Sequence, residues 1–83
     1  MIRFHGHGGV TLAADEAGPS DGPSVIFLHG GGQTRHSWGT ALDAASARGL
    51  HAITVDLRGH GDSDWAPDGD YRIDAHVGDI RAI

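Results

Sequence analysis

The chain has 83 residues, with 14 glycines, no cysteine, no lysine and a formal net charge of −5. Without cysteine, disulfides and thiolate zinc sites are excluded, and without lysine a Walker-type phosphate loop and a Schiff-base lysine are excluded too. An acidic chain that has neither a basic cluster nor a long apolar run is not expected to bind nucleic acid or membranes, and we expect it in the cytoplasm.

The first residues predict a β-hairpin. Residues 2–5 alternate between apolar and polar side chains, and residues 6–9 supply three glycines for a turn. Residues 10–14 then resume a strand-like pattern. A stretch dense in turn-forming residues, 17–23, separates this hairpin from the next predicted strand.

The middle of the chain predicts a strand, a helix and a second strand. Residues 25–28 are four consecutive apolar residues, which is typical of a strand buried on both faces of a parallel sheet. Residues 35–48 carry one apolar face at helical spacing and end at Gly49, a residue suited to the C-terminus of a helix. Residues 50–56 predict the second strand, so the unit is a right-handed βαβ crossover.

The C-terminal part predicts a long polar loop and a helix. The loop covers residues 57–71, and a helical stripe follows at Ile73, Val77, Ile80 and Ile83. No capping residue ends this helix, and the strand at 25–28 has a single parallel neighbour. We therefore expect residues 1–83 to be one partial domain, the N-terminal piece of a larger α/β domain with a mostly parallel sheet.

A glycine-rich segment is the first candidate for chemistry. His29 ends the buried strand, and Gly30, Gly31 and Gly32 lie between that strand and the next helix. Successive glycines allow close approach of a ligand and expose N–H groups to it, while a helix N-terminus adds a partial positive charge. The segment suits an oxyanion or a bound anion, and the alternative is a helix-entry turn that binds nothing.

The second candidate segment follows the second strand of the crossover and opens at the same edge of the sheet. Gly59 and Gly61 predict a sharply turning backbone. Asp56 and Arg58 are expected to form an ion pair that fixes this loop, and Ser63 is also assigned a structural role.

These two segments, with Trp38 in the intervening helix, resemble the N-terminal third of the α/β-hydrolase fold. The likeness covers essentially the whole chain and is greatest to the branch with epoxide hydrolases, haloperoxidase-like esterases, lactonases and C–C bond hydrolases. It implies that Gly31, or its neighbour Gly32, donates one oxyanion-hole N–H. His29 is expected to orient the neighbouring backbone, and Trp65 is a candidate for lining the substrate pocket. No cofactor is implied.

The catalytic triad of that family is not found in this chain. The resemblance implies a nucleophile on a G-x-S-x-G elbow, followed by an acid and a histidine. None of the five serines is predicted on such an elbow between a strand and a helix. We expect a hydrolase by lineage, which acts on a small-molecule ester, lactone or epoxide in the intact protein and is inactive as these 83 residues. The alternative is a non-enzymatic module that self-associates through an exposed strand edge.

Metal and dinucleotide sites are not predicted. The pair His5 and His7 lacks further ligands, and the cluster around His60, Asp62 and Asp64 does not have calcium-loop spacing. The glycine segment also fails the dinucleotide pattern, because an arginine stands where the last glycine would be.

Overall fold

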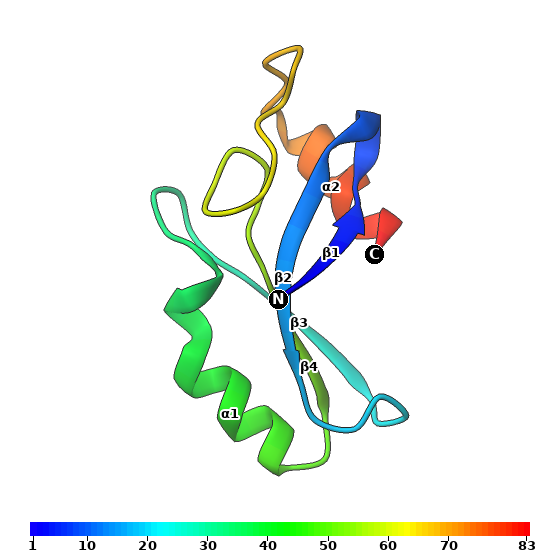
Figure 1. Cartoon of the computed structure of the whole chain (residues 1–83), viewed down its shortest axis with the longest axis vertical. Helices are drawn as coiled ribbons and strands as arrows, with labels where there is room; N and C mark the ends of the chain where they lie inside the picture. Colours follow the sequence, from blue (N-terminus) through cyan, green and yellow to red (C-terminus); the bar gives the residue numbers. More distant parts are fainter.

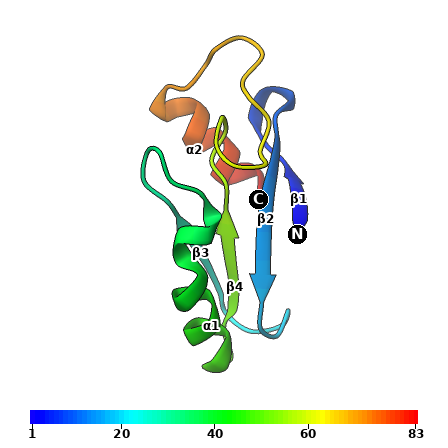
Figure 2. The ribbon, with the colours of Figure 1, turned by 60° about the vertical axis from the view of Figure 1, so that its left-hand side comes forward.

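All 83 residues are described in the computed structural model, which has a four-stranded sheet as its centre (Figure 1). Helix α1 runs along one side of this sheet, and helix α2 lies at the other end of the molecule beside the turn of the hairpin (Figure 2). In chain order the elements are β1 (Ile2–His5), the 3-10 helix η1 (His7–Gly9), β2 (Thr11–Ala17), β3 (Ser24–Leu28), the 3-10 helix η2 (Arg35–Trp38), α1 (Gly39–Ala47), β4 (His51–Val55) and α2 (Ile73–Ala82).

The sheet is mixed, with the strand order β1-β2-β4-β3. The predicted hairpin is confirmed, since β1 and β2 pair antiparallel, and the predicted crossover is confirmed by the parallel pairing of β3 with β4. The link between the two units is the antiparallel pair of β2 and β4. The helix of the crossover begins as η2, continues as α1 and ends before Gly49, whose φ of 82° lies in the left-handed region that glycine adopts at little cost.

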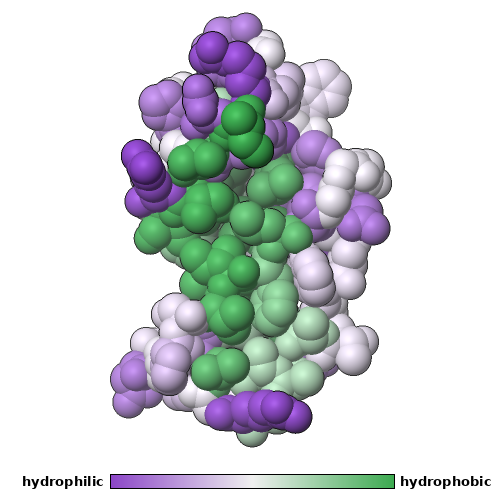
Figure 3. Space-filling model, turned by 180° about the vertical axis from the view of Figure 1, so that it is seen from behind, coloured by the Kyte–Doolittle hydropathy of each residue, from purple (hydrophilic) through white to green (hydrophobic).

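The core lies on the face of the sheet away from α1. β2 and β4 bury consecutive residues and so are covered on both faces, and the large apolar side chains of this face lie at every second position. The buried core cluster consists of Val10, Leu12, Ala14, Ile53 and Val55. Ile2, Phe4, Ile26 and Ile83 are partly buried and pack against this cluster. Seen from that side, apolar side chains form a band along the molecule (Figure 3).

Strand β3 is less buried than its sequence predicts. Both of its end residues, Ser24 and Leu28, are exposed and the three between are half-buried. The prediction of burial on both faces is wrong for this chain, because β3 is an edge strand with β4 as its single neighbour. Its contact on the α1 side is the packing of Phe27 against Trp38, with ring centres 5.2 Å apart. Trp38 itself lies in η2 and is half-buried.

Helix α2 forms where the sequence predicts it, but a different face is buried. Ala75 and Asp79 are its buried residues, whereas Ile73 and Val77 of the predicted apolar stripe are 75% and 45% exposed. The reason is electrostatic: the buried side of α2 is the side on which Asp79 meets Arg58. Ile73 and Val77 are therefore left open, whereas Ile80 and Ile83 of the same stripe are half-buried. No helix of the chain is long and apolar enough to cross a membrane.

Candidate functional site

The two candidate segments lie at one edge of the sheet. Because β3 and β4 are parallel, their carboxyl ends point the same way, and the loops that follow them, residues 29–34 and 56–64, come out side by side at that edge. Figure 2 shows both loops at the same end of the strands. In open α/β sheets, ligands bind at this edge.

The glycine loop keeps free N–H groups. Gly30 N–H donates to the Gln33 side-chain oxygen at 3.0 Å, and Gln33 N–H donates back to the Gly30 carbonyl at 3.1 Å. This turn bends the chain so that Gly32 takes a φ of 77°. The N–H groups of Gly31 and Gly32 donate to no group in the chain, and both residues are exposed. The loop therefore presents two adjacent donors to whatever lies in front of it.

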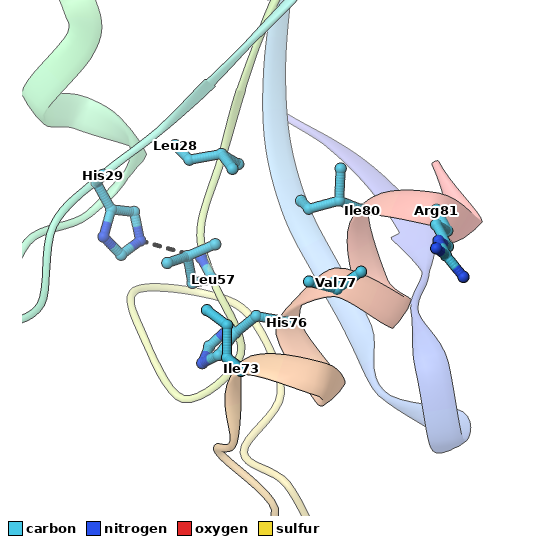
Figure 4. A pocket seen from close by; sticks show the side chains of 8 residues that line it. All are labelled: Leu28, His29, Leu57, Ile73, His76, Val77, Ile80 and Arg81. Carbon is cyan, nitrogen blue, oxygen red and sulfur yellow. Dashed lines mark hydrogen bonds between the residues drawn. The ribbon is translucent and has the colours of Figure 1, made fainter.

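His29 joins the two loops. Its ring is buried, and its Nε2 accepts a hydrogen bond of 3.0 Å from Leu57 N–H (Figure 4). Since Nε2 is the acceptor, the proton of the neutral ring is on Nδ1, which donates to the Gly30 carbonyl at 2.8 Å. The ring also packs against that of His60, with centres 4.9 Å apart. His29 thus fixes the start of the glycine loop against the loop after β4.

Asp56 does not pair with Arg58, so that prediction is wrong. Its carboxylate is fully buried and binds both the backbone N–H and the side chain of Arg35. The same guanidinium reaches Asp15 and Asp62 at 3.0 Å each. Burial alone would raise the pKa of Asp56, but the N–H groups of Arg35 and Asp62 and the Arg35 side chain lower it. Burial would likewise lower the pKa of Arg35, and its three carboxylate partners raise it instead.

Arg58 pairs with Asp79 of α2 instead. Two parallel hydrogen bonds of 2.7 and 2.6 Å join the guanidinium to the carboxylate, and both side chains are almost fully buried. Arg58 also donates to the carbonyls of His7 and Asp70, and Asp79 accepts from the His7 N–H. The bond to Asp79 raises the pKa of Arg58. Burial opposes the charge of Asp79, but Arg58 and the His7 N–H lower its pKa.

The remaining motif residues hold the second loop around Asp56. Gly61 has a φ of 49°, and a Cβ there would lie 2.2 Å from the Asp56 carboxylate. Ser63 Oγ donates to the Asp56 carbonyl and accepts from Ala13 N–H of β2 at 2.8 Å. At Gly59, a Cβ would lie 2.5 Å from the Tyr71 ring. These contacts explain why small residues and a hydroxyl stand at these positions.

An open groove of about 500 Å³ lies beside the two loops. Its wall is mostly apolar and is lined by Leu28, His29, Leu57, Ile73, His76, Val77, Ile80 and Arg81 (Figure 4). The Nδ1 of His76 is buried there and has no hydrogen-bond partner. Trp65, the sequence-based candidate for a pocket wall, is 77% exposed and lies outside this lining.

Sequence reasoning missed the ion-pair partners Arg35 and Asp79. Each lies 21 positions from the residue that it pairs with, so no local pattern connects them. The predicted motif residues do gather at one edge, with His29 touching both loops. No group of three or more histidine and acidic side chains is placed to hold a metal ion.

Comparisons with known proteins match the part of the chain that contains both loops of the candidate site. The family model described as the alpha/beta hydrolase fold matches residues 23–83. An esterase of Mycobacterium tuberculosis is 53% identical over 49 residues, which cover 59% of this chain and 15% of the esterase. Epoxide hydrolase 1 of Siraitia grosvenorii is 42% identical over 77 residues, which cover 90% of this chain and 24% of that protein.

The fold comparison agrees. A crystal structure of an epoxide hydrolase from Vigna radiata superposes with a TM-score of 0.88 and 36% identity, and the match covers 98% of this chain and 26% of that one. The chain thus spans about a quarter or less of the length of these proteins. Its four-stranded mixed sheet with its helices fits an N-terminal piece of their fold.

Proposed function

The chain belongs to the α/β-hydrolase fold family, and from that premise we propose that a complete domain built on it hydrolyses an ester, a lactone or an epoxide by nucleophilic catalysis. The observation that carries this proposal is the pair of unused N–H groups at Gly31 and Gly32. They lie at the edge of the sheet where such folds bind ligands, and His29 holds the start of their loop in place.

The chemistry needs donors of this kind. When a nucleophile attacks the carbonyl carbon of an ester or lactone, the oxygen takes on negative charge, and fixed N–H groups stabilise that charge more than they stabilise the neutral substrate. An epoxide has no carbonyl, but a carboxylate nucleophile opens its ring to form an ester, and the same charge develops when water hydrolyses that ester. In this proposal Gly31 N–H supplies one donor, with Gly32 as its neighbour. The nucleophile, a serine or an aspartate, and a second donor come from outside the 83 residues. Ser20 alone among the serines and aspartates has glycines two positions before and after it, but it lies in a turn between β2 and β3, whereas a nucleophile elbow joins a strand to a helix.

The groove beside the loops supports a substrate with an apolar part. Leu28, Leu57 and Ile80 form an apolar wall next to His29, so a hydrocarbon group could rest there while the reacting carbon faces the glycine loop. The names of the relatives include both an esterase and an epoxide hydrolase, and both substrate classes belong in the test.

The proposal is tested by removing one donor in a complete domain that carries this segment. The Gly31→Pro substitution deletes the N–H, and we expect kcat with an ester or epoxide substrate to fall about 100- to 1,000-fold. The matched control is Ser20→Pro. Ser20 is exposed and is the second residue of a turn closed by Gly22 N–H and the Pro19 carbonyl, a position that favours proline. A Gly31→Pro enzyme as active as the Ser20→Pro enzyme would contradict the proposal.

The 83-residue chain by itself is proposed to be inactive. It holds part of an oxyanion hole and no nucleophile elbow, and the donor alone cannot form a covalent intermediate. A purified sample assayed with p-nitrophenyl esters and with an epoxide is expected to show no turnover above buffer. Turnover that persists in the Gly31→Pro chain would mean that a different group performs the chemistry.

A further inference from the structure

The glycine loop is attached to the loop after β4 at both of its ends. At its start, His29 Nε2 accepts a hydrogen bond from Leu57 N–H (Figure 4). At its end, Arg35, the first residue of η2, donates its backbone N–H to the carboxylate of Asp56 at 2.6 Å. Asp56 and Leu57 are neighbours in the chain, so one short segment at the end of β4 receives both attachments. The free N–H groups of the glycine loop lie between them.

The side chain of Arg35 reinforces the attachment at the end of the loop. Its Nη1 donates to the second oxygen of Asp56, so the backbone and the side chain of one residue bind the two oxygens of one carboxylate. Nη1 also donates to Asp62, and Nε donates to Asp15 of β2, each at 3.0 Å. Arg35 is buried, and carboxylates from β2, the end of β4 and the loop after β4 together fix its guanidinium.

We propose that Arg35 is a positioning residue for the N–H donors of Gly31 and Gly32. This role rests on the proposed hydrolytic function, since Arg35 acts through those donors and does not touch the substrate. A donor stabilises a developing oxyanion only when it is held where the charge appears, and a displacement of about 1 Å can lower a rate about 100-fold. The N–H groups of the two glycines bind nothing in the chain, so their position depends on how the ends of the loop are held.

The contacts of Arg35 go beyond what neutralising a buried carboxylate requires. One bond from any cation would give Asp56 a counter-ion, but Arg35 uses two nitrogens of one rigid plane, toward β2 and toward the loop after β4. A lysine cannot place its single nitrogen at both positions. The other buried arginine, Arg58, also binds a carboxylate and two carbonyls, but none of its partners belongs to the glycine loop. Arg35 is therefore placed to fix the end of that loop, and Arg58 is not.

The kinetic test uses Arg35→Lys in a complete domain that carries this segment. The positive charge is kept, so the domain is expected to fold, but the planar arrangement of donors is lost. We expect kcat per folded molecule with an ester substrate to fall about 10- to 100-fold while KM stays the same. The matched control is Arg48→Lys, because Arg48 is exposed at the C-terminal end of α1. An Arg35→Lys enzyme as active as the Arg48→Lys enzyme would overturn the proposal.

A double substitution distinguishes positioning of the donor from general support of the fold. If Arg35 acts through the Gly31 donor, Arg35→Lys should lower kcat by less than about 3-fold in a domain from which Gly31→Pro has already removed that donor. A fall as large as in the domain with Gly31 intact would show that Arg35 acts through another group, and would overturn the proposal.

The backbone order parameter from nitrogen relaxation gives a measurement that does not depend on hydrolysis. In the complete domain we expect about 0.85 at Gly31 and Gly32, the value of rigid backbone, and less than about 0.6 in Arg35→Lys. Asp62→Ala removes one carboxylate at an exposed position, where folding is not at risk, and should give values between these. Unchanged order at both glycines in Asp62→Ala would overturn the proposal even if Arg35→Lys did not fold. Lost order together with an unchanged kcat in Gly31→Pro would support the positioning and contradict the hydrolytic function.

Discussion

The two loops of the candidate site, at one edge of the sheet, are built in opposite ways. The loop after β4 surrounds a buried carboxylate, and Asp56, Arg58 and Ser63 are all buried in it. The glycine loop after β3 is exposed, and little besides His29 and one turn holds it. The loop after β4 is therefore a buried, hydrogen-bonded support, whereas the glycine loop keeps its N–H groups available. A donor site needs both, because a free N–H is useful only if its position is fixed.

The largest effect is expected from breaking the buried pair that fixes α2 to the support. Asp79→Asn keeps the shape of the side chain but leaves Arg58 buried without its counter-ion, which should cost about 3–5 kcal/mol of the free energy of unfolding. Urea denaturation followed by circular dichroism measures this change. Asp74→Asn, on the exposed first turn of the same helix, serves as control and should change stability by less than about 0.5 kcal/mol.

The same pair predicts a dependence on pH. Pairing lowers the pKa of Asp79 in the folded chain below its ordinary value near 3.9. Its contribution is therefore fully present above about pH 4–5 and is lost as the pH falls through the folded pKa. Asp79→Asn should flatten the acid side of the stability profile. An unchanged acid slope would show that this pair does not support α2.

Adding one methyl group to a glycine of each loop tests directly whether the two loops differ in packing. Gly61→Ala would drive its Cβ into the Asp56 carboxylate at a left-handed φ, and we expect a loss of about 2–3 kcal/mol. Gly31→Ala meets no atom within 4 Å and has no positive φ, so its effect on stability should stay within about 0.5 kcal/mol. Urea midpoints of the two variants, compared at equal m-value, give the answer. Similar losses in both would mean that the glycine loop is as tightly packed as the support.

Replacing His29, which connects the two loops, should lower the free energy of unfolding by a smaller amount. His29→Ala leaves Leu57 N–H and the Gly30 carbonyl without their bonds, which should cost about 1–2 kcal/mol and speed amide exchange in both loops. His36→Ala is the control, because His36 is exposed and its ring makes no hydrogen bond in the chain. Unchanged exchange at Leu57 in His29→Ala would show that the ring does not hold the loops together.

The smallest effect is expected at the outer rim of the second loop. The hydrogen bond from exposed Arg72 lowers the pKa of Asp70 to about 2. A carbon-detected NMR titration should find that value and should find it moved up toward 3.8 in Arg72→Gln. The contribution of this pair to stability is present above the ordinary pKa and disappears as the pH falls through about 2. Because the pair is exposed and screened by solvent, its loss in Arg72→Gln should lower the unfolding midpoint near neutral pH only slightly.

Local sequence patterns were sufficient to predict the strands and helices and the position of the candidate site. Alternation and glycines predicted the β1–β2 hairpin, and an apolar run, a helical stripe and Gly49 predicted the crossover. The parallel crossover then places the glycine loop and the Asp56 loop at one edge. What local patterns did not reveal were the partners of Asp56 and Arg58, because Arg35 and Asp79 are each 21 positions away in the chain.

The sequence by itself therefore determined the strands, the helices, their order and the glycine loop, since these depend on the period of side chains along the backbone and on backbone freedom at glycine. Only the tertiary structure decided which charges pair, which face of α2 is buried and that β3 is a half-exposed edge. Those features depend on which surfaces meet in space. A buried charge must find an opposite charge wherever the fold brings one within reach, and spacing along the chain does not specify where that is.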